Sequence, residues 1–235
     1  MENIDRLISF GLTRQEASIY LLLFQEGELN GYEVSKLTSI SRSNAYNALA
    51  SLVDKGAAYV IEGDTIKYTP VPMKEFCNNK IRDLTINKKE ILKSVPKRRT
   101  ESNGYITITG EKHIMDKFRN MLKNAEQRVY LSVYDHILSK FEDELTALVK
   151  RGIKVVIITN LPFKLEGAII YYAKRKAEQI RLIADSKYVL TGEISDKVNS
   201  TCLYSSNDNL VEIFKESLTN EIKLIKLKEG WLLND

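Results

Sequence analysis

The residues best suited to chemistry in this 235-residue chain are short polar side chains at the start of one predicted helix. Arg42, Ser43, Asn44 and Asn47 follow Ser41 at positions that leave one helix face polar. In the DNA major groove, arginine pairs bidentately with guanine and asparagine with adenine, each pair discriminating by about 1–3 kcal/mol. The pattern predicts a helix that presents base-reading side chains at its N-terminal end.

Two short helical segments separated by a polar turn would position this helix. Gly31 to Thr38 is expected to be helical with Val34 and Leu37 turned inward, and Ser39-Ile40-Ser41 is the turn. The Ser41 hydroxyl can cap the next helix by accepting a bond from a free backbone amide. The second helix ends at Gly56 and has a packed face made of Ala45, Leu49, Leu52 and Val53.

The segments on either side complete a winged helix-turn-helix. Thr13 and Glu16 have the spacing of a capping box that starts a scaffold helix from Arg14 to about Gln25. Residues 57–71 alternate apolar and polar types around Gly63-Asp64, which suits a tight hairpin turn. The residues expected to meet DNA, here called the candidate DNA face, are Lys36, Ser41, Arg42, Ser43, Asn44, Tyr46, Asn47, Thr65 and Lys67.

Two alternatives remain open for this face. Tyr46 would either hydrogen-bond a phosphate or pack its ring against the wing. The whole face would serve a protein-interaction module if it docked a protein partner in place of DNA. Residues 1–70 favour that alternative, because six Lys and Arg against nine Asp and Glu give a net charge of −3.

Residues 73–96 are predicted to form one long helix for linkage and dimerisation. Apolar positions recur in alternating steps of four and three, which is the rhythm of a coiled-coil seam, although Lys88 interrupts it. The alternative is a helix that packs along its own domain. The residues expected at a homodimer contact are Ile81, Leu84, Ile91 and Val95.

From Gly104 the pattern changes to strands alternating with helices. Strand-like runs at 128–134, 154–160 and 180–185 are nearly continuous in apolar residues, and helices are expected between them, including one at 166–178. Further strands are expected at 105–110, 188–194 and 201–206, and a last amphipathic helix from about Asn209 to Leu227. Such strands predict an α/β domain with a mostly parallel sheet covered on both faces. Ligands bind beyond the carboxyl ends of strands in such sheets, so Asp135, Asn160, Asp185 and Lys187 form a tentative effector pocket. Asp135 and Asn160 would equally serve as caps.

The sequence resembles the TrmB-type family of transcriptional regulators. The resemblance rests on GLTRQEASIYLLL (11–23), on SRSNAYNALASLVDKG (41–56) and on the wing leading to PVPMKEF (70–76). It implies a dimer that binds operator DNA, with a C-terminal effector domain similar to half of a phospholipase-D fold. The sugar-responsive members have a further C-terminal region, and this chain stops at Asp235, so the resemblance does not imply a sugar effector, and a small-molecule effector would be of unknown type.

The phospholipase-D signature departs from its pattern at the nucleophile. That signature needs a histidine two residues before a lysine, and in IADSKYVLTGE (183–193) Asp185 stands where the histidine would be, before Lys187. The chain's histidines, His113 and His136, are followed two residues later by Met115 and Leu138. No catalytic residue is therefore expected, and a phosphodiesterase or nuclease is the least favoured function.

The bulk composition describes a globular cytoplasmic protein of two domains. The chain is 43% hydrophobic and 28% charged, has no apolar run long enough for a bilayer, and has two widely separated cysteines. No metal-ligand spacing or glycine-rich phosphate loop is present, so neither metal nor cofactor is expected. The predicted boundaries are 1–72 for the winged helix-turn-helix, 73–96 for the helix, 97–103 for a linker and 104–235 for the α/β domain.

Overall fold

The computed structural model describes residues 2–96, 104–174, 178–195 and 200–232. The chain divides into two compact units, Met1–Arg98 and Arg99–Asp235, and each is described by itself. The predicted linker at 97–103 lies outside the described residues. Among the described residues no helix is long and apolar enough to cross a membrane.

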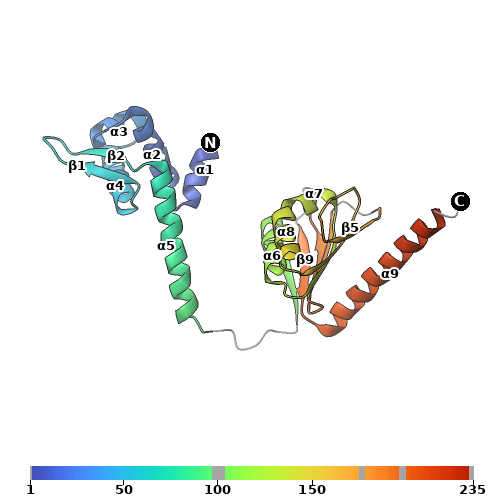
Figure 1. Cartoon of the computed structure of the whole chain (residues 1–235). Helices are drawn as coiled ribbons and strands as arrows, with labels where there is room; N and C mark the ends of the chain where they lie inside the picture. The colour runs from blue at the N-terminus through green and yellow to red at the C-terminus, as the bar shows by residue number, and fades with distance from the viewer. Residues whose placement is uncertain (1, 97–103, 175–177, 196–199, 233–235) are drawn as a thin grey trace. The chain divides into compact units, whose positions relative to one another are not determined.

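The first unit is a helical cluster with one hairpin (Figure 1). Its elements in chain order are α1 (Glu2–Ser9), α2 (Arg14–Glu26), α3 (Gly31–Thr38), α4 (Arg42–Asp54), β1 (Ala58–Ile61), β2 (Lys67–Pro70) and α5 (Met73–Ser94). The two strands pair antiparallel from Ala58 opposite Pro70 to Ile61 opposite Lys67. The connection between them spans residues 62–66, so the tight turn expected at Gly63-Asp64 is a longer loop. The acidic side chains of Glu62 and Asp64 are both exposed in that loop.

Helix α2 is the centre of this unit. Its predicted capping box is confirmed: Thr13 Oγ1 accepts from the Glu16 amide and Glu16 Oε2 accepts from the Thr13 amide. Tyr20 is completely buried and donates its hydroxyl hydrogen to the Val71 carbonyl at 2.7 Å, which attaches the end of the hairpin to α2. The predicted packed face of α4 is confirmed, whereas Leu37 of α3 is 53% exposed and does not turn inward as expected.

Glu16 also ties α2 to α4. Its carboxylate is buried and accepts from Ser51 Oγ at 2.7 Å and from Lys55 Nζ at 2.6 Å, both on or next to α4. Burial acts to raise the pKa of Glu16, but the bonds from Lys55, the Thr13 amide and Ser51 outweigh it and lower the pKa. A depressed carboxyl pKa stabilises the fold above the unfolded-state value of about 4.5. That stability is lost as pH falls through the lower folded-state pKa.

Helix α5 leaves the N-terminal core after two turns. Phe76 is buried between Tyr20 and Phe10, but every residue from Ile81 to Pro96 is exposed within its own chain. The alternative of a helix that packs along its own domain is therefore wrong for the described part of this unit.

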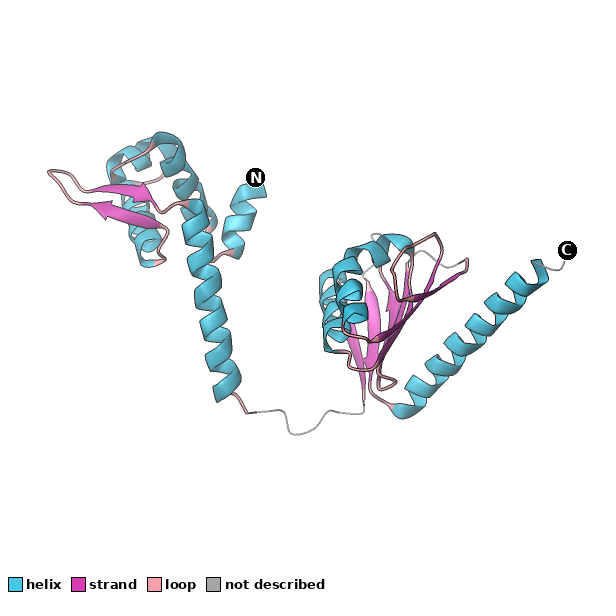
Figure 2. Cartoon of the chain, in the orientation of Figure 1, coloured by secondary structure: helices cyan, strands magenta, loops and turns pink. Residues whose placement is uncertain are grey.

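The second unit is one seven-stranded mixed sheet with helices on its two faces (Figure 2). Its first elements are β3 (Tyr105–Thr109), α6 (Glu111–Asn124), β4 (Arg128–Ser132), α7 (Asp135–Leu138), η1 (Ser139–Phe141), α8 (Glu142–Lys150) and β5 (Lys154–Thr159). They are followed by β6 (Ile169–Tyr172), β7 (Gln179–Ala184), β8 (Tyr188–Glu193), β9 (Thr201–Ser205) and α9 (Asp208–Leu232). The order across the sheet is β3-β9-β8-β7-β4-β5-β6.

Two predictions for this unit are wrong. The sheet is not mostly parallel, because only β4–β5 and β5–β6 run parallel while the other four pairs are antiparallel. The helix expected at 166–178 is absent from its described part, where Ile169–Tyr172 is an edge strand and 175–177 lie outside the described residues. The run Ile-Ile-Tyr-Tyr is β-branched and aromatic, which favours a strand packed beside β5.

The two faces of the sheet have separate cores. Helices α6, α7 and α8 cover one face and bury side chains such as Phe118, Phe141 and Leu145 against the central strands. Helix α9 covers the other face through Val211, Leu218 and Ile225, which pack on Ile158 and Ile183. The predicted final helix from Asn209 to Leu227 is confirmed and extends further.

We expect Glu16→Gln to loosen the contact between α2 and α4. The neutral amide removes the partner of Lys55 and weakens two further bonds, which costs about 2 kcal/mol of unfolding free energy. Hydrogen exchange of the full chain, read by mass spectrometry at pH 7, should accelerate in both helices. Glu26→Gln, on the exposed end of the same helix, is the matched control and should leave the exchange unchanged. Equal exchange in the two variants would contradict the role assigned to Glu16.

Candidate nucleic-acid interface

The turn between α3 and α4 is held by side-chain caps at both helix starts. Asn30 forms a capping box with Glu33, with bonds of 2.9 and 2.8 Å. Ser39 ends α3 in the left-handed conformation at φ 57°, and Ser41 begins α4 by accepting from the Asn44 amide at 3.3 Å. The cap predicted at Ser41 is confirmed, and these contacts set the angle at which α4 leaves the turn.

The structure brings most of the candidate DNA face together on α3 and α4. Ala45, Leu49 and Leu52 are fully buried on the inner side of α4. On the outer side, the exposed members are Ser41, Arg42, Ser43, Asn44, Tyr46 and Asn47, with Lys36 exposed on α3. Thr65 is exposed in the hairpin connection and Lys67 is half-buried on β2. Residues 1–70 are acidic overall, so the distribution of their cations matters more than the sum.

Ion pairing separates the six cations of residues 1–70 into two groups. Arg6 pairs with Glu2, Arg14 pairs with Asp5 at 2.7 Å, and Lys55 pairs with Glu16 at 2.6 Å. Within residues 2–96 the structure forms no ion pair to the other three, which are Lys36, Arg42 and Lys67. All three belong to the candidate DNA face, so its positive charge is available to an outside anion.

Tyr46 makes a contact that was not among the arrangements expected for it. A Cβ built on Gly31 would lie 2.5–2.7 Å from three atoms of the Tyr46 ring, so this ring rests directly on the glycine at the start of α3. The side chain stays 46% exposed. Tyr46 therefore joins the two helices of the turn to each other and does not pack on the hairpin.

The four residues predicted for an effector pocket lie in two separate places. Asp135 and Asn160 bond each other after β4 and β5: the Asp135 amide donates to Asn160 Oδ1 at 2.8 Å, and Asn160 Nδ2 donates to Asp135 Oδ1 at 3.0 Å. Asp185 and Lys187 lie at the opposite end of the central strands, beside the start of β4, because β7 runs antiparallel to β4. The carboxyl ends of antiparallel strands do not meet at one edge, so these four cannot line one pocket.

Asp185 has a structural partner set of its own. Its carboxylate accepts hydrogen bonds from the backbone amides of Glu126, Gln127 and Arg128 at 2.7–3.2 Å. Burial acts to raise the pKa of Asp185, but the amide bonds, with help from the charge of Lys187, lower it. At the position predicted for the nucleophile of the phospholipase-D signature, this chain has a carboxylate that binds the backbone at the start of β4.

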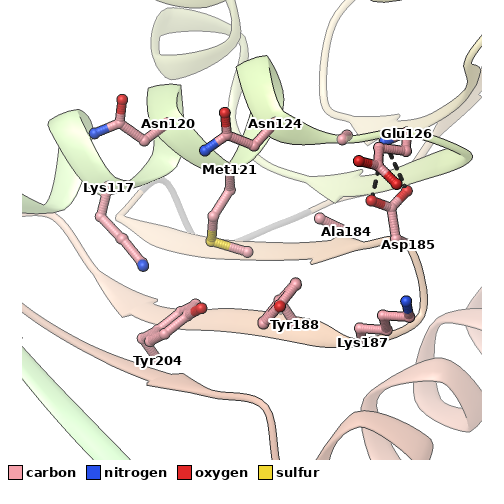
Figure 3. A pocket seen from close by; sticks show the side chains of 11 residues that line it. Lys117, Asn120, Met121, Asn124, Glu126, Ala184, Asp185, Lys187, Tyr188 and Tyr204 are labelled. Atoms are coloured by element: carbon pink, nitrogen blue, oxygen red, sulfur yellow. Dashed lines mark hydrogen bonds between the residues drawn. The ribbon is translucent and has the colours of Figure 1, made fainter. Parts of the chain in front are cut away.

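Asp185 and Lys187 also line a cavity of about 450 Å³ beneath α6 (Figure 3). Asp135 and Asn160 are not part of its lining. Among the described residues, no group of three or more His, Cys, Asp and Glu side chains is arranged to hold a metal ion.

Residues 7–74 match the family described as the sugar-specific transcriptional regulator TrmB, and residues 104–222 match the N-terminal subdomain of the EBD of that regulator. The chain belongs to the TrmB family of transcriptional regulators.

Two relatives and one solved structure illustrate the family relation. The chain is 26% identical to the uncharacterized protein YrhO of Bacillus subtilis strain 168 over 235 residues, covering 95% of this chain and 86% of that protein. It is 27% identical over 204 residues to the putative HTH-type transcriptional regulator TrmBL2 of Pyrococcus furiosus, covering 76% and 77%. A structure of TrmBL2, described as an archaeal chromatin protein, aligns at 21% identity and a TM-score of 0.46, covering 94% and 97%.

Tyr32 contacts the candidate DNA face of this TrmB-family chain, although the sequence did not predict a role for it. Tyr32 is 47% exposed on α3, and the guanidinium carbon of Arg42 lies 4.5 Å from the centre of its ring. A cation above an aromatic face is attracted by about 0.5–1 kcal/mol at an exposed site. Tyr32 therefore restrains the Arg42 side chain in the absence of a ligand. The one sequence signal for this contact is that Tyr32 lies ten residues before Arg42, on the neighbouring helix.

We expect Tyr32→Leu to free the Arg42 side chain without unfolding the unit. In the wild type, the Arg42 Nε proton should resonate upfield, because it lies in the shielding zone above the ring. The proton NMR shift should return towards the free-arginine value in Tyr32→Leu. Tyr32→Phe keeps the ring and should keep the upfield shift, so loss of the shift in both variants would contradict the ring contact.

Proposed function

We propose that residues 1–72 form a winged helix-turn-helix that binds operator DNA, with α4 as the reading helix in the major groove. The observation that carries this proposal is that Lys36 and Arg42, which have no ion pair within residues 2–96, are exposed on the same helix pair as the candidate base-reading side chains Asn44 and Asn47. Membership of a family of transcriptional regulators supports the same function.

One copy of this winged helix-turn-helix presents few positive charges to the phosphate backbone of DNA. Three available cations beside the exposed Glu62 and Asp64 give modest electrostatic attraction. Two copies bound to half-sites about one DNA turn apart would double the contacts and add their free energies. We therefore propose a homodimer, joined through α5.

The exposed surface of α5 supports this dimer. Ile81, Leu84, Ile91 and Val95 are 53%, 62%, 56% and 58% exposed. The first three recur at coiled-coil spacing along one side of α5, and Val95 follows directly after the last turn of the helix, in an extended conformation. A second copy would bury this row. The C-terminal unit would then sense a ligand or hold the dimer, and a ligand would act by changing the spacing of the two winged helix-turn-helix units.

We do not assign phospholipase-D-type catalysis to the second unit. Asp185 occupies the nucleophile position and its carboxylate is taken up by three backbone amides. The second candidate function is a protein-interaction module, which is favoured by the net charge of −3 in residues 1–70.

Selection of bound sequences from random duplex DNA tests the proposal. We expect a two-fold symmetric site, and Asn47→Ala should weaken binding to it by about tenfold, since one adenine pair is worth ~1–3 kcal/mol. The affinity is measured by gel shift. Ser43→Ala, one turn earlier on α4, is a milder comparison. A serine hydroxyl can bond more than one type of base, so its loss should weaken binding less than Asn47→Ala does.

The salt dependence separates DNA binding from the protein-interaction alternative. Six available cations in a dimer predict a slope of log K against log salt of about −5. No enrichment of any duplex, or an Asn47→Ala variant that binds as tightly as wild type, would contradict the assignment of α4.

We expect the double variant Leu84→Glu/Ile91→Glu to be monomeric. Four carboxylates placed in one seam repel each other and cannot be buried without a partner. Sedimentation equilibrium of the full chain should show the wild type as a dimer and the variant as a monomer. Ile86→Glu, 50% exposed on the other side of α5, is the control and should remain dimeric. A wild-type monomer at micromolar concentration would contradict the dimer.

A further inference from the structure

The cavity of about 450 Å³ in the second unit lies between α6 and the strands β7, β8 and β9. Figure 3 shows Lys117 and Met121 reaching from α6 towards the sheet, with Tyr188 and Tyr204 below them. The turn between β7 and β8 closes one end, where Asp185 and Lys187 line the cavity. Its size suits a small metabolite.

The floor of the cavity combines aromatic rings with a cation. The Tyr188 and Tyr204 rings stack with their centres 6.1 Å apart and their planes 13° from parallel. The ammonium group of Lys117 lies 3.5 Å from the centre of the Tyr204 ring. This contact holds a positive charge at the cavity floor, on a side chain that is half-buried.

The other end is formed by a turn in an unusual conformation. Asp185 and Ser186 both have φ 54°, and the Lys187 amide donates to the Ala184 carbonyl at 3.0 Å, as in a type I′ turn. Aspartate tolerates this conformation, whereas serine adopts it at a cost, and such a conformation persists where surrounding contacts impose it. Here the bonds from three amides to the Asp185 carboxylate impose it, and the turn presents Lys187 at the mouth of the cavity.

The charges around the cavity favour an anion. Two lysines, Lys117 and Lys187, line it, together with two carboxylates, Asp185 and Glu126. The Asp185 carboxylate accepts hydrogen bonds from the backbone amides of residues 126–128, as Figure 3 shows for Glu126, so these amides stabilise much of its negative charge and Lys187 adds a smaller attraction. Glu126 is exposed at the edge.

We propose that this cavity binds a small metabolite that carries an oxyanion, with Lys187 and Lys117 as its cationic partners. Phosphate esters and carboxylates are the two sources of such a group. The site gives the ligand-sensing part of the proposed function a place and a ligand chemistry. It depends on that function only for its regulatory consequence, because binding itself needs no DNA.

Isothermal titration of the full chain without DNA tests the site. The probes are inorganic phosphate, glycerol 3-phosphate and succinate, each at an ionic strength held constant with sodium chloride. We expect at least one probe to bind, and the preferred probe identifies the source of the oxyanion. Lys187→Met, which removes one exposed charge, should weaken that binding by about fivefold.

Two further variants keep the result interpretable. Lys117→Met retains the packing stem and should weaken binding as well, whereas Lys112→Met removes an exposed lysine from the same helix outside the cavity and should have no effect. Absence of heat with all three probes, or equal loss in Lys112→Met, would overturn the site. Gel shifts with the selected duplex report DNA binding separately, so failure of the cavity and failure of the proposed function are distinguishable.

Discussion

The carboxylate of Glu16 is the contact on which the first unit depends. It closes the capping box that starts α2 and accepts from both Ser51 and Lys55, so one buried group fixes the start of the scaffold helix and the far end of α4. A buried charge is tolerable only when it is paired and hydrogen-bonded, and here it is both. Glu16 lies outside the candidate DNA face, yet its bonds to Ser51 and Lys55 help to fix the helix that carries most of that face.

Ion pairing also decides where charge is available. The same bond that satisfies Glu16 neutralises Lys55, and Arg6 and Arg14 are neutralised by their own acidic neighbours. What remains positive is concentrated at α3, the start of α4 and β2. The cations of this acidic segment that form no ion pair within residues 2–96 therefore lie on the candidate DNA face, which the net charge alone does not reveal.

In the second unit the same physical device, a carboxylate that accepts backbone amides, has a different consequence. Asp185 joins the β7–β8 turn to the start of β4, and the turn reverses the chain so that β8 pairs antiparallel with β7. Because β7 runs antiparallel to β4, this turn lies beside the start of β4, away from the Asp135–Asn160 pair, and it places Asp185 with Lys187 beside the cavity. The residue predicted to stand at the nucleophile position thereby lines the cavity.

The sequence by itself determined the local elements of the first unit, because caps, periodicity and glycine positions act over a few residues. The sequence predicted the capping box of Thr13 and Glu16, the N-cap at Ser41 and the packed face of α4. It also predicted the apolar row along α5. In the second unit the sequence indicated most strands and the last helix, but an apolar run such as Ile169–Tyr172 has no periodicity that separates strand from helix.

Only the tertiary structure decided strand direction, the partners of buried polar groups and the composition of the cavity. Strand direction depends on pairings between residues such as Leu131 and Leu182, which are far apart in the chain. Tyr32 beneath Arg42 and Gly31 beneath Tyr46 are contacts between facing helices, and no short-range pattern encodes them. Hydrogen bonds between residues a few positions apart can be predicted from those residues alone. Packing between residues far apart in the chain depends on the folded arrangement of the elements that carry them.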